Sequence, residues 1–227
     1  MLTNTGDVEY TGESLVPTVY GITQAFNGAN NGFTSATIST GSGNDKVTGL
    51  AYSSNSNVII GIGNFFSSKI DTGAGRDKVK GKASGTATDN ITGISQTTDP
   101  DLSATNNLIV TGNGDDKVIG VGDGTSETNI SGISQTLGNN QLITGNGNDK
   151  VIGKASGNLE VISGELGEVA PGIVGISQQL GKQKISTGNG ADEVIGEASG
   201  TAGQMAGIGQ QGSEDLIITE SGYPNGS

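Results

Sequence analysis

The sequence predicts an all-β protein, a single-domain parallel β-solenoid (β-helix) of about six coils, with three short strands per coil and little or no helix. A glycine-rich turn that closes on an aspartate recurs along the chain, and its threonines succeed one another by 32, 39, 33, 43 and 32 residues. Isoleucine clearly outnumbers leucine, and threonine and valine are common, which favours pleated structure. No stretch shows the i, i+3, i+4, i+7 apolar spacing of an amphipathic helix. The turns begin at Thr40, Thr72, Thr111, Thr144, Thr187 and, in truncated form, Thr219.

Three apolar columns accompany each turn and predict the three strands of a coil. The first column stands two residues before the threonine, the second stands two residues after the aspartate, and the third lies in Gly-Ile-Ser-Gln segments. After the second column the pattern continues as Val-x-Gly-x-Ala, which places small side chains on one face and lets two walls of the coil approach closely. The first column comprises Ile38, Ile70, Ile109, Leu142, Ile185 and Ile217, the second Val47, Val79, Val118, Val151 and Val194, and the third Ile22, Ile62, Ile94, Ile133, Ile176 and Ile208.

The repeat runs from one end of the chain to the other, which predicts one domain over residues 1–227. Residues 1–39 form a degenerate N-terminal coil, residues 40–218 form the regular coils, and residues 219–227 form a truncated C-terminal turn. Solenoid ends are open sheet edges and usually carry a cap. Neither end of the chain shows a helical cap.

Composition excludes several classes of function. The formal net charge of −12 and the absence of a basic stripe along the sequence disfavour nucleic acid as a partner. No apolar run approaches the ~20 residues that span a bilayer. The first residues lack the build of a secretory signal, and the absence of cysteine rules out a disulfide framework. The acidic, repetitive chain is expected to be extracellular or at the cell surface.

The turn resembles the glycine- and aspartate-rich nonapeptide of the RTX, or haemolysin-type, calcium-binding repeats. It matches as Thr-Gly-x-Gly-x-Asp-x-Val, with threonine in place of the first glycine and one turn per long coil instead of one every nine residues. The resemblance implies Ca²⁺ held between stacked turns by aspartates and glycine carbonyls. The implied ligands are Asp45, Asp77, Asp116, Asp149 and Asp192, with the carbonyls of Gly41, Gly73, Gly112, Gly145 and Gly188.

A second interpretation of the aspartates needs no metal. Each carboxylate would accept hydrogen bonds from turn amides, and the lysine that follows it would neutralise its charge. Lysine follows the aspartate in four turns, whereas Glu193 follows it in the fifth. These lysines are Lys46, Lys78, Lys117 and Lys150.

Two further columns suggest structural roles. The amides that follow the third apolar column predict a ladder of stacked side chains, as in cross-β structures. The turn threonines could match an ice lattice if they lay on a flat exposed face, or could simply pack beside the turn. The amide column comprises Gln24, Asn64, Gln96, Gln135, Gln178 and Gln210.

Catalysis has few candidate groups, because the chain contains no histidine and no cysteine. We therefore expect no enzyme and no catalytic residues. The sequence favours a structural protein, a calcium-binding solenoid subunit that joins copies of itself end to end into an extracellular filament. The alternatives are a repeat module of a secreted adhesin or ice-binding protein, and a polysaccharide-processing β-helix enzyme. A surface or matrix polysaccharide is a further possible partner. The expected self-association residues are Leu2, Thr3, Leu216, Ile217, Ile218 and Thr219.

Overall fold

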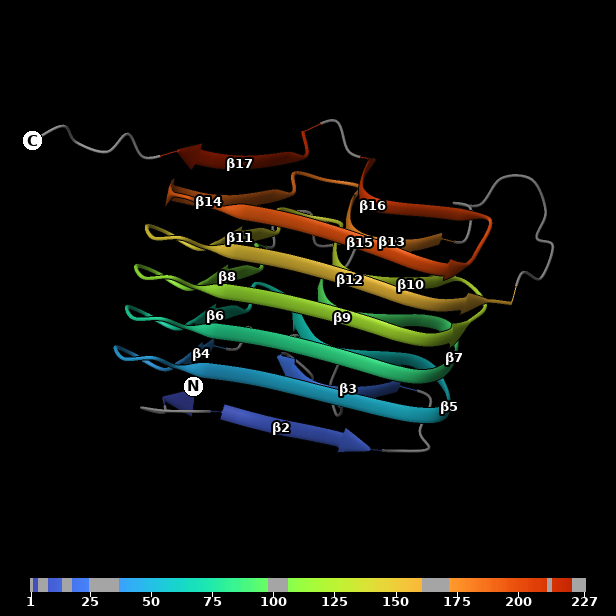
Figure 1. The fold of residues 1–227 in the computed structure, drawn as a ribbon. Helices are drawn as coiled ribbons and strands as arrows, with labels where there is room; N and C mark the ends of the chain where they lie inside the picture. Colours follow the sequence, from blue (N-terminus) through green and yellow to red (C-terminus); the bar gives the residue numbers. More distant parts are fainter. Residues whose placement is uncertain are drawn as a thin grey trace, which may run out of the picture.

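A computed structural model describes residues 2–3, 8–13, 18–24, 37–97, 106–160, 172–211 and 214–221. Within these ranges the chain consists of β-strands, turns and short connections, and every paired strand lies parallel to its neighbour (Figure 1). The predicted all-β class with parallel strands is thereby confirmed. The described residues contain no helix that is long and apolar enough to cross a membrane.

The strands form two sheets. The seven-stranded sheet has the order β1 (Leu2–Thr3), β4 (Thr37–Ser39), β6 (Lys69–Asp71), β8 (Leu108–Val110), β11 (Gln141–Ile143), β14 (Lys184–Gly190) and β17 (Leu216–Ser221). The ten-stranded sheet has the order β15 (Glu193–Thr201), β12 (Lys150–Leu159), β9 (Lys117–Ser126), β7 (Lys78–Thr97), β10 (Asn129–Thr136), β13 (Gly172–Gln179) and β16 (Gln204–Gln211), with β5 (Lys46–Phe65) against β7 and β2 (Val8–Glu13) and β3 (Thr18–Gln24) against β5.

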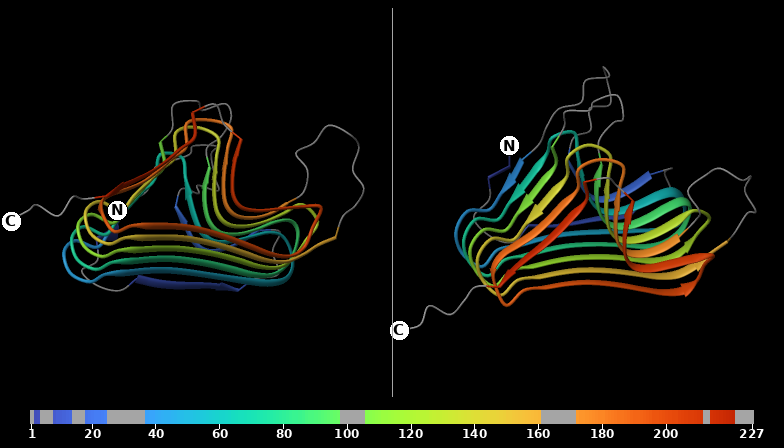
Figure 2. Two further views of the ribbon diagram at one scale, coloured as in Figure 1. Left: turned by 45° about the horizontal axis from the view of Figure 1, so that its top comes forward. Right: turned by 90° about the horizontal axis from the view of Figure 1, so that it is seen from above.

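Equivalent residues of successive repeats pair with one another. Ile70 pairs with Ile109 in one sheet, and Val118 pairs with Val151 in the other. The turns also stack, through parallel bridges such as Asn113 with Asn146. Figure 2 shows that successive repeats trace similar outlines. One repeat therefore supplies one strand to the seven-stranded sheet and either one long strand or two shorter strands to the ten-stranded sheet.

The three predicted columns form the core. In the central repeats the isoleucine, leucine and valine side chains are completely buried and belong to one apolar cluster. A second cluster contains the predicted alanines together with a fourth column that the sequence patterns did not single out, Ile59, Ile91, Ile130 and Ile173. This column lies three residues before the Gly-Ile-Ser-Gln isoleucine, so aligning the repeats on that motif would have revealed it.

The glycines of the second column let two segments of the ten-stranded sheet approach closely, as predicted. A Cβ atom added at Gly120 would lie 2.1 Å from the carbonyl oxygen of Gly132, and one at Gly153 would lie 2.1 Å from that of Gly175. Real Cβ atoms do not approach oxygen so closely, so only glycine fits here.

Candidate functional site

The five turn aspartates lie in one row, one per repeat, and their side chains face inward. The backbone amide of each of the first four aspartates donates to the Oδ1 atom of the aspartate in the next repeat. The N···Oδ1 distances are 2.8 Å for Asp45 to Asp77, 2.8 Å for Asp77 to Asp116, 2.9 Å for Asp116 to Asp149 and 2.9 Å for Asp149 to Asp192. The carboxylates thus join neighbouring repeats.

The second oxygen of each of these carboxylates, Oδ2, is buried and has no hydrogen-bond partner among the described residues. Burial raises the pKa of Asp116 to about 6, against the opposing effect of the hydrogen bond from the amide of Asp77. Burial likewise raises the pKa values of Asp77 and Asp149. A proton on Oδ2 would remove the buried charge, so Asp77, Asp116 and Asp149 favour the protonated form more than an ordinary surface aspartate does.

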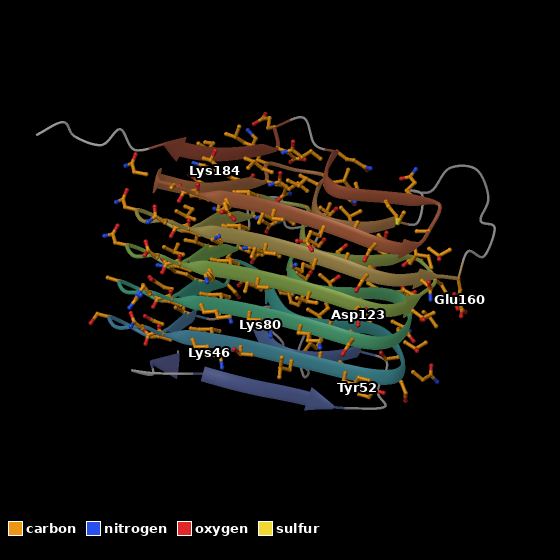
Figure 3. The ribbon with its side chains drawn as sticks, viewed as in Figure 1. Lys46, Tyr52, Lys80, Asp123, Glu160 and Lys184 are labelled. Atoms are coloured by element: carbon orange, nitrogen blue, oxygen red, sulfur yellow. The ribbon has the colours of Figure 1, made fainter. Side chains whose placement is uncertain are left out.

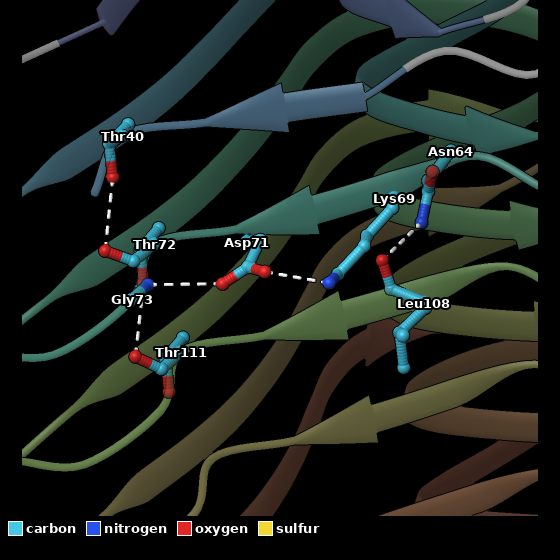
Figure 4. Close-up of polar contacts among 8 residues, drawn as sticks. All are labelled: Thr40, Asn64, Lys69, Asp71, Thr72, Gly73, Leu108 and Thr111. Carbon is cyan, nitrogen blue, oxygen red and sulfur yellow. Dashed lines mark hydrogen bonds and ion pairs between the residues drawn. The ribbon is translucent and has the colours of Figure 1, made fainter. Parts of the chain in front are cut away.

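The turn threonines form a second column, and Figure 4 draws three of them, Thr40, Thr72 and Thr111. The hydroxyl of Thr40 donates to the carbonyl of Thr72 at 3.2 Å, and that of Thr72 donates to the carbonyl of Thr111 at 3.4 Å. The five threonines of the complete turns are buried. This column therefore cannot offer its hydroxyls to an ice surface, and the ice-lattice interpretation of it is wrong.

The oxygen atoms in this row are poorly arranged as calcium ligands. A calcium ion takes six to eight oxygen ligands, but each carboxylate uses Oδ1 for an amide and keeps one oxygen to spare. The carbonyl of Gly41 faces the next turn, since its oxygen would lie 1.6 Å from a Cβ atom at Gly73. Within the described residues no three acidic side chains gather into a group that could hold a metal.

Among the described residues, Lys78, Lys117 and Lys150 form no ion pair with the aspartates that precede them, contrary to the second interpretation. Because side chains alternate along a strand, an inward aspartate places the next residue on the outer face. No ion pair joins Lys78 or Lys117 to an aspartate of the row in the described part of the chain, and Lys150 pairs with Glu193 at 3.0 Å. The hydrogen-bonding part of that interpretation agrees with the structure, with bonds between repeats instead of within one turn.

The predicted amide ladder is confirmed for the glutamines whose side chains are described. Gln135 Nε2 donates to Gln96 Oε1 at 2.9 Å, Gln178 Nε2 to Gln135 Oε1 at 2.8 Å, and Gln210 Nε2 to Gln178 Oε1 at 2.7 Å. Asn64 instead donates to the carbonyl of Leu108 at 3.2 Å. The side chain of Gln24 lies outside the described set.

A second buried polar column escaped the sequence analysis. Asn107 Nδ2 donates to Asn140 Oδ1 at 2.9 Å, and Asn140 Nδ2 donates to Gln183 Oε1 at 2.9 Å. The backbone N–H of Gln183 donates to Asp215 Oδ1 at 3.3 Å. These residues each stand two positions before the first apolar column, so aligning the repeats on that column would have identified them.

A groove of about 400 Å³ runs across the outer surface of β7, β10 and β13. Its described lining is mostly hydroxyl and amide side chains such as Asn90, Ser134 and Gln179, with Tyr20 and Phe65 in edge contact nearby. Tyr20 and Phe65 thus both line this groove. Tyr20 is the one titratable side chain in this described lining, and burial raises its pKa. The groove therefore has no pair of acid and base groups of the kind that hydrolysis uses.

Comparison with family models, with curated proteins and with solved structures finds no match for the chain. The function is therefore inferred from the geometry described above.

Proposed function

We propose that this chain is a non-enzymatic structural protein whose repeats wind as a β-solenoid and whose copies join end to end into an extracellular filament. The observation that carries the proposal is the open end of the stacked core at β15, β16 and β17. Ile208 is 41% exposed, whereas its register partner Ile176 is fully buried. In the interior repeats the next repeat covers this position, so a second copy could cover it here.

The residues at the two ends match in chemical type. Val194, Ile208 and Ile217 end the three apolar columns at one end. At the other end the strand register assigns these columns to Val8, Ile22 and Leu2. Adding a copy would continue valine on valine and isoleucine on isoleucine. A head-to-tail contact of this kind does not close on itself, so it extends as a filament.

The strand order refines which edges meet. The seven-stranded sheet contains a strand from each of seven levels, β1 through β17, whereas β2, β5, β7, β9, β12 and β15 supply six levels on the facing wall. Suppose that β2 of an added copy stacks on β15 of the first copy. Then β1 of the added copy and β17 of the first copy would compete for the same position beside β14. We expect the longer strand β17 to pair with β4 of the next copy and to displace β1. Leu216 to Thr219 would then form the contact, whereas Leu2 and Thr3 would not.

Sedimentation velocity and negative-stain microscopy test this assembly. We expect species that grow with protein concentration, filaments with an axial rise of about 29 Å per copy, and strands spaced at about 4.8 Å. The Ile208→Glu variant should stay monomeric, because a carboxylate on the open column would be buried by an added copy.

The matched control is Ile195→Glu, which introduces the same charge into the same repeat but on the outer face, where Ile152 and Ile195 pair side by side. This control should form filaments like the parent chain. Removal of residues 1–3 should also leave assembly intact. A parent chain that stays monomeric at high concentration, or equal loss of assembly in both glutamate variants, would exclude the proposed contact.

The calcium part of the expectation rests on the family resemblance and has its own test. The double variant Asp116→Ala and Asp149→Ala should lose thermal stability equally with calcium and with a chelator, because each carboxylate is a hydrogen-bond acceptor between repeats. A ligand stabilises a fold only when the folded state binds it better. Destabilisation that appears in calcium and vanishes in chelator would restore calcium as a resident ion.

The open end also fits a module of a longer adhesin, in which further repeats of the same chain would cover Ile208. The reading frame beyond Ser227 separates these two functions. Continuing repeats would favour the module, and a stop codon would favour the filament subunit.

A further inference from the structure

Most of the basic residues of this acidic protein lie on the outer face of β5, β7, β9 and β12 in the ten-stranded sheet. The chain has ten lysines and one arginine, Arg76, against 23 acidic residues. The strands β5, β7, β9 and β12 lie side by side (Figure 1), and alternation along them brings seven of those lysines to one face. Figure 3 labels two of these lysines, Lys46 and Lys80. We name this surface the lysine face, and it comprises Lys46, Lys78, Lys80, Lys82, Lys117, Lys150 and Lys154. No basic stripe is visible along the sequence, whereas the fold brings these lysines together.

The register places like charges directly side by side. Lys78 pairs with Lys46 on one side and with Lys117 on the other, and Lys117 pairs with Lys150. Like charges opposite one another on neighbouring strands destabilise a sheet. The spacing between them is about 4.8 Å, the distance between paired strands.

The lysine face is only partly neutralised by its own chain. Lys150 and Lys154 pair with Glu193 and Glu197 at 3.0 Å and 2.7 Å. The central lysines of β7 and β9 have no ion-pair partner among the described residues, and Lys82 and Lys117 are exposed. Lys78, Lys80 and Lys82 leave a row of positive charge along β7, and Lys117 extends it by one strand in the stacking direction.

An apolar stripe crosses the lysine face. Ile119, Ile152 and Ile195 lie in register on the outer surface, with the column of Lys117 and Lys150 on one side. Val121 and Lys154 occupy the column on the other side. The isoleucine column carries Lys80 on β7, and on β15 the two flanking columns end in Glu193 and Glu197. A linear ligand along this column would meet isoleucines over β9 and β12 and the lysines without ion-pair partners over β7 and β9.

We propose that the lysine face binds a linear acidic polysaccharide along the stacking direction. Sugar rings present C–H groups to the isoleucine stripe, and carboxylate groups on successive sugars meet the lysines. Single-stranded nucleic acid fits less well, because such sites stack bases on aromatic side chains and Tyr52 is the one aromatic residue on this face in the described strands. The face also lacks arginine, which recognises phosphate by paired hydrogen bonds.

Immobilised polygalacturonate and the full-length chain provide the test. We expect binding that weakens steeply between about 50 mM and about 200 mM salt. The reason is that binding releases counterions from the polyanion, and added salt opposes that release. The triple variant Lys78→Gln, Lys80→Gln and Lys117→Gln should bind about tenfold more weakly. Polygalacturonate in solution should also raise the unfolding temperature of the parent chain and leave that of the triple variant unchanged.

The matched control changes three lysines away from this face, Lys69→Gln, Lys182→Gln and Lys184→Gln, and so alters the net charge equally. It should bind like the parent chain. Equal weakening in both triple variants would show that net charge alone decides binding and would overturn the proposal. Binding to single-stranded DNA as tight as to polygalacturonate would overturn the polysaccharide assignment. Circular dichroism of each variant verifies the fold, and none of these outcomes depends on filament formation.

Discussion

Replacing Gly120 with alanine is expected to lower the free energy of unfolding by roughly 3 kcal/mol. The added Cβ would lie 2.1 Å from the carbonyl oxygen of Gly132 and 2.7 Å from its carbonyl carbon. These atoms are backbone in the facing strand and cannot rotate away, so the two walls must separate and the isoleucine and valine columns must loosen. Denaturant unfolding followed by circular dichroism measures the loss.

Gly203→Ala is the control for this substitution. A Cβ at Gly203 would have no atom within 4 Å, so the change in stability should stay within about 0.5 kcal/mol. Equal losses in the two variants would mean that glycine matters here through chain entropy, and that the close approach of the walls is not what demands it.

The protein is expected to become more stable as the pH falls from 8 towards 4. Burial raises the pKa of Asp116 from its usual 3.8 to about 6, so the folded state holds this proton more tightly than the unfolded state does. The resulting stabilisation is fully present below the unfolded pKa and is lost as the pH rises through about 6. A shift of this size corresponds to roughly 3 kcal/mol. Asp77 and Asp149 act in the same direction.

Two variants of Asp116 isolate this effect. Asp116→Asn keeps an oxygen that can accept the amide of Asp77, but it removes the titration. Its stability should match the parent chain near pH 4 and exceed it above pH 7. Asp116→Ala leaves the Asp77 amide without its acceptor and should be less stable by about 1–3 kcal/mol at every pH.

Thermal unfolding across this pH range provides the measurement. A calcium site would give the opposite slope in calcium buffer, because its carboxylate ligands must be deprotonated. If the free energy of unfolding fell steadily on acidification in chelator, the raised pKa values of Asp77, Asp116 and Asp149 would be contradicted.

The sequence predicted the fold class well because the repeat carries its own register. Once Thr72 and Thr111 are aligned, Ile70 falls on Ile109 and Val79 on Val118, and the structure pairs these residues. Only parallel strands from successive repeats give such ladders. The fourth apolar column and the column of Asn107 and Asn140 follow from the same alignment, but they lack a conspicuous motif.

The candidate site was predicted less completely. The aspartates do form one row, as the turn spacing required, yet the motif does not say whether a carboxylate faces solvent or the core. That choice depends on which face of the next strand packs against the interior. Val118 and Val151 are fully buried. The alternation therefore turns Asp116 inward and Lys117 outward, and so separates two residues that the sequence suggested as an ion pair.

The sequence by itself thus determined the repeat, its apolar columns and the parallel pairing of equivalent strands, because each is a local pattern repeated at a readable spacing. Only the tertiary structure decided where the charges lie. Lysines separated by more than 30 residues along the chain, such as Lys78 and Lys117, become neighbours only when repeats stack. Burial, which sets the pKa of Asp116, likewise exists only once the repeats on both sides are in place.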